Sequence, residues 1–340
     1  MAGEIASTSK IQLGVVPTHL KFVGGLVPND EGKLPRGEDG VLGVVTEMDH
    51  LIKTSPVKIE SVQIPVFPGV HQGDNEELIT KLKDLGLVVH LILMVGGADP
   101  MNPDDEDKVV EMLVSGLNVA KKHGIEQVSS TSVEEWMKAG ASPKEGADFD
   151  AAVAQDVKVH VRASKEGGVE GSCIKAWHIE FLRGGEFQTF TSAAKIWKFV
   201  KAANEAYGST FFKVMIDAAH CGDSELSIPE NESVIDEIAA AGALGIFHAS
   251  AKTTRGCLST DDGWIGALLT ACAKTGGLEY AFVELFHHED AALEGLRKLD
   301  PGHGLDTRDG RTYSEAVVDG LVDVARRLNN LVTRKILPGA

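Results

Sequence analysis

The sequence has few of the features that mark secreted, membrane-spanning or disulfide-stabilised proteins. Only four of its 340 residues are cysteines, and they form no CxxC pair: Cys173, Cys221, Cys257 and Cys272. A chain of this length does not need disulfides for stability, so a reducing compartment fits best. The first residues, MAGEIASTSK, lack the regions of a signal peptide, and no run approaches the roughly 18 apolar residues of a membrane span. We therefore expect a soluble, cytoplasmic protein.

Basic residues are also scarce. The chain has 33 Lys and Arg against 50 Asp and Glu, which gives a formal net charge of -17. Such a surface repels nucleic-acid phosphates and anionic lipid headgroups, so neither nucleic acid nor a membrane is an expected partner. Hydrophobic residues make up 43% and charged residues 24%, an ordinary globular composition with ample material for a core.

Short apolar, β-branched runs alternate with longer segments of helical period, a pattern typical of repeated βα units around a parallel sheet. Eight runs qualify as strands: Ile11–Val16, Ile59–Phe67, Val88–Val95, Gln127–Ser130, Ile174–Phe181, Phe211–Ile216, Leu244–His248 and Tyr280–Phe286. The clearest helices are predicted over Asn75–Leu85, Asp105–His123, Ser192–Tyr207, Glu230–Ala241, Asp262–Thr275 and Tyr313–Val332. The predicted fold is α/β: a (β/α)8 TIM barrel over residues 1–340, in one domain. A doubly wound open sheet is the alternative.

Two stretches add length to this barrel. Val27–Gly40 is rich in Gly, Pro and charge and reads as an elaborated βα loop, which in a barrel lies on the active-site side. Glu134–Gly171 contains the interrupted stretch KAGASPKEGAD, and after it the segment AAVAQDVKVHVRA, whose periodicity is ambiguous. We interpret this region as an insertion followed by the fourth helix.

Residues able to ligate a metal follow or end four strands in the second half of the chain. The fifth strand leads to Glu180, the sixth to Asp217 and His220, the seventh to His248, and the eighth to Glu284. In a barrel the carboxyl ends of the strands point into one mouth. Any one of these side chains alone would more often be a solvated rim residue, but four on successive strands predict a shared site.

Carboxylates that face each other in a low-dielectric pocket repel, unless a cation or a proton lies between them. Three carboxylate ligands and one imidazole suit a hard divalent ion, with Mn²⁺, Mg²⁺ or Co²⁺ preferred over a thiolate-seeking metal. We expect this set to bind one divalent ion: Glu180, Asp217, His248 and Glu284.

These motifs resemble the xylose isomerase-like TIM barrel superfamily, and within it the ketose 3-epimerases of the D-tagatose and D-psicose type. In that family a strand-five glutamate is followed six residues later by another, as Glu180 is by Glu186. The sixth strand carries Asp-x-x-His, matched by Asp217-Ala-Ala-His220, and the seventh a histidine followed by an arginine, matched by His248 and Arg255. The resemblance covers about Cys173 to Phe286; earlier residues match only in rhythm.

The resemblance implies a function and a role for each of these residues. It implies a metal-dependent sugar isomerase or epimerase, with Mn²⁺ as the preferred ion and a small sugar as the substrate. Glu186, His220 and Arg255 would bind substrate oxygens. Glu180 and Glu284 would be the acid and base that exchange the proton beside the carbonyl. We also expect a homo-oligomer.

Two other enzymatic functions remain open, as does a non-catalytic sugar-binding or structural barrel. A lyase or dehydratase acting on a 3-keto-glycoside or an inosose would share the proton abstraction and add an acid for the leaving group, for which His178, His220 or His287 could serve. An endonuclease IV-like phosphodiesterase would share the barrel but needs a multi-zinc cluster, whereas the third and fourth strands here end in VGG and SST. Trp136 and Trp264 could form an apolar wall for a sugar ring, although Trp264 also suits helix packing, and His178 could equally be a core histidine.

Overall fold

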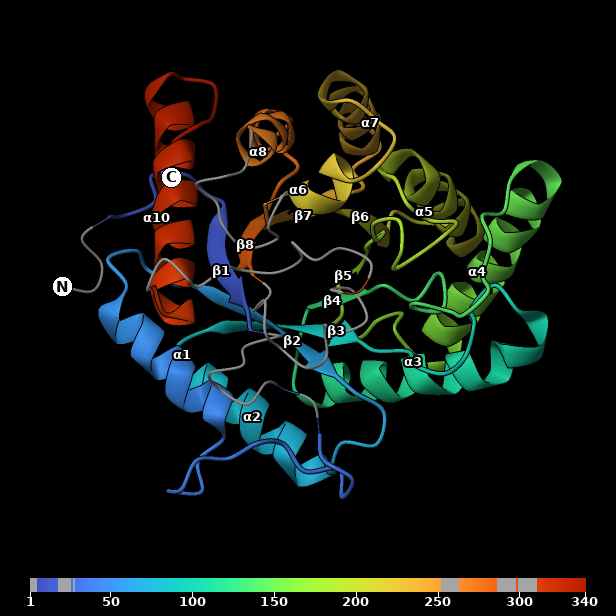
Figure 1. The fold of residues 1–340 in the computed structure, drawn as a ribbon, viewed down its shortest axis with the longest axis horizontal. Coiled ribbons are helices and arrows are strands. Elements are labelled where there is room, and N and C mark those ends of the chain that lie inside the picture. Colours follow the sequence, from blue (N-terminus) through green and yellow to red (C-terminus); the bar gives the residue numbers. More distant parts are fainter. Residues whose placement is uncertain (1–4, 18–25, 27, 252–262, 286–297, 299–310) are drawn as a thin grey trace.

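Eight parallel strands pair in chain order, and β1 pairs with β8 to close a barrel at the centre of the fold (Figure 1). The structure, a computed structural model, describes residues 5–17, 26, 28–251, 263–285, 298 and 311–340. The strands are β1 (Gln12–Val16), β2 (Ser61–Val66), β3 (Val88–Leu93), β4 (Gln127–Ser130), β5 (Ala176–Ile179), β6 (Phe212–Asp217), β7 (Leu244–Ala249) and β8 (Tyr280–Glu284). The predicted (β/α)8 barrel is confirmed.

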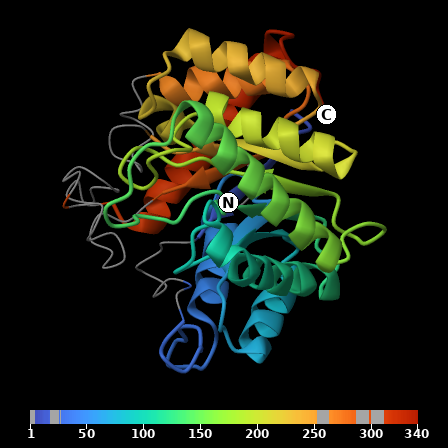
Figure 2. The same ribbon diagram turned by 90° about the vertical axis from the view of Figure 1, so that its right-hand side faces the viewer.

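Helices surround the barrel in Figure 1, and the view turned by 90° in Figure 2 shows them packed side by side on its outside. They are α1 (Gly43–Thr54), α2 (Gln72–Asp84), α3 (Glu106–Lys122), α4 (Gly146–Glu166), α5 (Ala193–Tyr207), α6 (Ala218–Gly222), α7 (Ile228–Ala240), α8 (Trp264–Lys274) and α10 (Tyr313–Thr333). A 3₁₀ turn at Pro103–Asp105 precedes α3. No helix in the described ranges is long and apolar enough to cross a membrane.

The main hydrophobic core lies between the barrel and its helices. On α3 the buried apolar residues follow the helical spacing that the sequence predicts, with Val109, Val110, Leu113 and Leu117 all turned inward. Alternate strand residues such as Leu13 and Val15 meet the helices from the other side. The region after Glu134 also matches its interpretation, since an irregular segment leads into the 21-residue helix α4.

The other face of each strand points into the barrel. A small apolar layer there consists of Val16, Met215, Ile246 and Phe282. Gly14 makes room for it, because a Cβ atom at this position would lie 2.6 Å from Phe282 Cδ1 and 2.4 Å from Ser61 Oγ. Strand alternation places the residue two positions further along each strand on the same inner face, nearer the carboxyl end. The candidate site is built from those residues.

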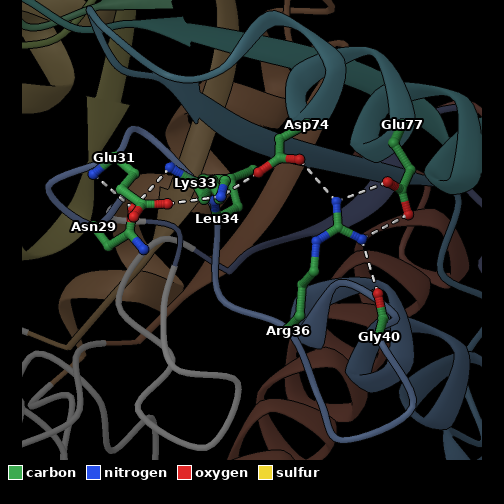
Figure 3. A network of polar contacts seen from close by, with 8 residues as sticks. All are labelled: Asn29, Glu31, Lys33, Leu34, Arg36, Gly40, Asp74 and Glu77. Atoms are coloured by element: carbon green, nitrogen blue, oxygen red, sulfur yellow. Dashed lines mark hydrogen bonds and ion pairs between the residues drawn. The ribbon is translucent and has the colours of Figure 1, made fainter.

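Residues 28–42, the part of the chain directly before α1, are anchored on α2 through one arginine (Figure 3). Arg36 Nη2 donates to Asp74 Oδ1 and to Glu77 Oε2, each at 2.8 Å, and Asp74 Oδ2 accepts the Leu34 amide at 2.8 Å. Burial works to raise the pKa of Asp74, but the Leu34 amide and the Arg36 guanidinium outweigh it and lower that pKa. The ion pair between Arg36 and Asp74 therefore holds this segment against the first turn of α2. That turn follows the carboxyl end of β2.

Candidate metal centre

Four acidic and imidazole side chains meet inside the carboxyl end of the barrel: those of Glu180, Asp217, His248 and Glu284. Each offers one ligand atom, and these atoms all lie within 4.8 Å of one another. All four residues are buried, with at most 8% of any one exposed. The structure therefore brings together the complete set that the sequence predicts as metal ligands, and a buried group of this composition could bind a divalent metal.

Their positions follow from strand geometry. Asp217, His248 and Glu284 each come two residues after a member of the apolar inner layer, Met215, Ile246 and Phe282. Glu180 directly follows β5 and comes two residues after the inward-facing His178. In the sheet register Asp217 stands opposite His248, and Glu284 stands opposite Val16. On their own strands Met215, Ile246 and Phe282 thus lie one inward-facing position before Asp217, His248 and Glu284.

His248 is at the centre of the group. Its Nδ1 atom lies 3.0 Å from Glu284 Oε2, 3.5 Å from Glu180 Oε1 and 3.9 Å from Asp217 Oδ2. Burial alone would lower the pKa of this imidazole, but the negative charges of Glu284 and Glu180 outweigh it and raise the pKa well above its ordinary value. For Glu180 the directions are reversed: burial alone would raise the pKa of this carboxyl group, but the positive charge of His248 outweighs burial and lowers it.

This arrangement fits a divalent cation. The three carboxylates and the imidazole converge on one point in a buried space, where like charges cannot remain close without a compensating positive charge. Glu180 Oε1 is buried and has no hydrogen-bond partner among the described residues. The side chains supply three oxygens and one nitrogen, a donor set that suits Mn²⁺ or Mg²⁺.

His220 lies against this group without being part of it. It belongs to the short helix α6, which follows β6 directly and which the sequence analysis does not identify. Asp217 caps this helix, because its Oδ1 atom accepts the His220 amide at 2.8 Å. The cap brings His220 Nδ1 to 3.4 Å from Glu180 Oε1, and the histidine is only 1% exposed.

Glu186 lies in the segment after β5 and is held by the segment after β4. Its Oε1 atom accepts the Trp136 indole N–H at 3.2 Å, and its carbonyl oxygen accepts the Met137 amide at 2.9 Å. Glu134 fixes the same segment from below, since its carboxylate accepts the three backbone amides of residues 188–190 at 2.8 to 3.1 Å. Trp136 itself is 47% exposed.

The remaining candidates have simpler positions or cannot be placed. His178 is buried inside the barrel, where Nε2 lies 2.9 Å from Gln127 Oε1, and burial lowers its pKa well below the ordinary value. It is a core histidine below the site. Trp264 packs against the main core from α8. Arg255 and His287 lie outside the described residues.

Gln63, which none of the sequence motifs indicates, contacts His248. This glutamine lies in β2 and is fully buried, and its Oε1 atom is 2.7 Å from His248 Nε2. Its signal in the sequence is weak: an amide side chain in the mostly apolar stretch SVQIPV, at an inward-facing position.

No protein-family model and no curated protein matches this sequence. Solved structures do match: a D-psicose 3-epimerase from Clostridium cellulolyticum H10, solved with D-tagatose, is 15% identical with a TM-score of 0.66, over 94% of this chain and 99% of that one. A putative sugar phosphate isomerase/epimerase from Anabaena variabilis is 18% identical with a TM-score of 0.71, over 96% and 99%. An AP endonuclease of family 2 from Brucella melitensis is 11% identical with a TM-score of 0.58, over 80% and 92%. At such identities the likeness shows the fold alone, which is the barrel that the sequence predicts.

Proposed function

We propose that this protein is a divalent-metal-dependent sugar isomerase or epimerase, which exchanges the proton on the carbon beside the carbonyl of a ketose or keto-sugar. The observation that carries this proposal is the buried group at the carboxyl ends of β5 to β8, in which four ligand atoms lie within 4.8 Å of one another. Structures of ketose 3-epimerases that share the fold support it.

The ion would be held by Glu180, Asp217, His248 and Glu284, with Mn²⁺ preferred and Mg²⁺ or Co²⁺ as the other candidates. When bound, a divalent ion polarises a carbonyl oxygen and makes the neighbouring C–H more acidic. A homo-oligomer in the cytoplasm stays a prediction, which sedimentation and cell fractionation can test.

The chain itself would move the proton. Glu180 and Glu284 come from strands that are separated around the mouth by β6 and β7, so their carboxylates can approach a substrate carbon from two sides. One carboxylate oxygen takes the proton and the other returns it, and burial keeps water from competing. His220 and Glu186, together with Arg255, would hold substrate oxygens, and the exposed ring of Trp136 would cover the apolar face of the sugar.

Metal analysis tests the ligand set. Replacement of Asp217 or His248 by Ala should remove most of the bound Mn²⁺ from protein that is loaded and then passed over a desalting column. His220→Ala and Arg255→Ala are the matched variants that should keep it. Wild-type occupancy in both the Asp217 and the His248 variants would refute the assignment. Loss of metal in His220→Ala equal to that in Asp217→Ala would make His220 a ligand.

Isotope exchange tests the reaction. Turnover in D₂O should place deuterium on the carbon beside the carbonyl, and a substrate deuterated at that carbon should react more slowly. Glu180→Gln and Glu284→Gln should each lower the rate about 10²- to 10⁴-fold, the range for a positioned proton-transfer group. If several ketoses and keto-glycosides show neither exchange nor an isotope effect, the proton-transfer function is wrong.

One observation favours a lyase as the second candidate. His220 Nδ1 lies 3.4 Å from Glu180 Oε1, so an imidazole stands beside the candidate base and could protonate a leaving group. Free ketoses assayed against 3-keto-glycosides separate the two reactions, because only the lyase releases the aglycone. A phosphodiesterase is not favoured, since the described part of the chain holds a single group of metal-binding side chains.

A further inference from the structure

Gln63 reaches the metal centre from the far side of His248. It projects from β2 into the barrel and contacts three other strands: Ser129 on β4, Met215 on β6 and His248 on β7. Gln63 Nε2 donates to Ser129 Oγ at 2.7 Å and lies 3.8 Å from Met215 Sδ. A fully buried amide is costly unless its polar atoms are bonded, and here both ends of the amide have partners.

The direction of these hydrogen bonds follows from the bond between Ser129 and the Leu91 carbonyl oxygen. Ser129 Oγ donates to the Leu91 carbonyl oxygen, which can only accept. The serine oxygen therefore accepts the Gln63 amide N–H, and this leaves Gln63 Oε1 facing His248. A carbonyl oxygen is an acceptor only, so the ring nitrogen that it meets at 2.7 Å, Nε2, must carry a proton.

The contacts of Nδ1, on the other side of the His248 ring, agree with a proton on Nε2. Nδ1 faces carboxylate oxygens of Glu284 and Glu180 at 3.0 and 3.5 Å, and these also act as acceptors. Whether a proton or a cation stands between Nδ1 and the carboxylates, Nε2 keeps its own proton and its bond to Gln63. The amide need not turn when an ion enters.

We propose that Gln63 is a positioning residue of the metal centre: it holds the proton of His248 on Nε2, so that Nδ1 presents its lone pair to the ion. The inference rests on the proposed function, since it assigns a residue that acts on the proposed ligand. Partners of this kind orient metal-binding histidines, and their loss typically lowers metal affinity about 10- to 100-fold.

Two substitutions of Gln63 show whether it acts as a hydrogen-bond acceptor or only fills space in the barrel. Gln63→Met keeps the approximate length and volume but removes the acceptor oxygen, and it should weaken Mn²⁺ binding to the metal-free protein about 10- to 100-fold in calorimetry. Gln63→Glu keeps an acceptor for the Nε2 proton and should bind Mn²⁺ at least as tightly as the wild type. Ser129→Ala is the matched control: it removes the far hydrogen bond and leaves the acceptor, so its affinity should change only a few-fold.

A second measurement needs no variant and no metal. In ¹⁵N-histidine-labelled, metal-free protein, the Nε2 proton of His248 should be visible by NMR and protected from solvent exchange, and in Gln63→Met this protection should be lost. A bare Nε2 in the wild type, or Mn²⁺ affinity in Gln63→Met equal to the wild type, would overturn the proposal. So would an equal loss in Gln63→Met and Gln63→Glu, because the acceptor would then not be the cause. If the wild type binds no Mn²⁺ while its Nε2 proton is protected, the metal function has failed and the tautomer assignment has not.

Discussion

His90 should make the fold sensitive to acid, and a single substitution should remove part of that sensitivity. It lies on β3 inside the barrel, 1% exposed, with its ring centroid 4.4 Å from that of Tyr280 and 5.2 Å from that of Phe282. Neither ring nitrogen has a hydrogen-bond partner among the described residues. Burial lowers the pKa of His90 from its ordinary 6.5 to about 3.

The sign and size of the effect follow from this pKa. Below pH 6.5 the unfolded chain binds a proton at this histidine, whereas the folded chain does not until about pH 3. The free energy of unfolding therefore falls as the pH falls through this window. One proton corresponds to about 1.4 kcal/mol per pH unit, so His90 alone should destabilise the fold by about 2 kcal/mol at about pH 5.

The test compares His90→Leu with the wild type in urea titrations at about pH 8 and about pH 5, with a chelator present throughout. At the higher pH the variant should be as stable as the wild type or more so, because no hydrogen bond is lost. Between the two pH values it should lose about 2 kcal/mol less. His50→Leu, at an exposed position on α1, is the control and should follow the wild type. An equal loss in His90→Leu and wild type would show that His90 does not stay neutral in the fold.

Three further substitutions test other contacts. Gly14→Ala should lower the free energy of unfolding in urea by about 1–3 kcal/mol, because the new Cβ would lie 2.4 Å from Ser61 Oγ, whereas Gly96→Ala, in open space, should change it little. Arg36→Ala should cost about 1–3 kcal/mol in the same assay, since it leaves the buried Asp74 carboxylate without its guanidinium partner; unchanged stability would contradict this. Glu134→Gln should speed hydrogen exchange at the amides of residues 188–190, which lose a carboxylate acceptor; unaltered protection would show that the segment is held by other contacts.

The barrel and the four-residue group could be predicted because both depend on simple periodicities. A parallel strand places alternate residues inside, and a closed barrel gathers the strand ends, so ligands on β5 to β8 had to meet. Gln63 could not be found in this way. It lies on a distant strand, and what links it to His248 is a cross-barrel contact that no local pattern encodes.

Helix α6 and the contacts of Glu186 could not be predicted from the sequence either. Five residues are too few for a helical period, and α6 exists because Asp217 caps it immediately after β6. Glu186 was a candidate from its spacing, but its bond to Trp136 depends on how two long βα loops meet. The role of Arg255 stays a prediction outside the described residues.

The two oxygens of Asp217 link the interior of the barrel to its rim. Oδ2 lies 3.9 Å from His248 Nδ1, and Oδ1 accepts the backbone N–H of His220 in α6. A substitution of Asp217 that alters the proposed metal site would therefore also disturb the helix that carries His220. Asp217→Glu moves the carboxylate outward by one methylene and cannot satisfy both contacts at their present distances. Under the proposed function, the bound ion and the position of His220 would therefore both depend on this one side chain.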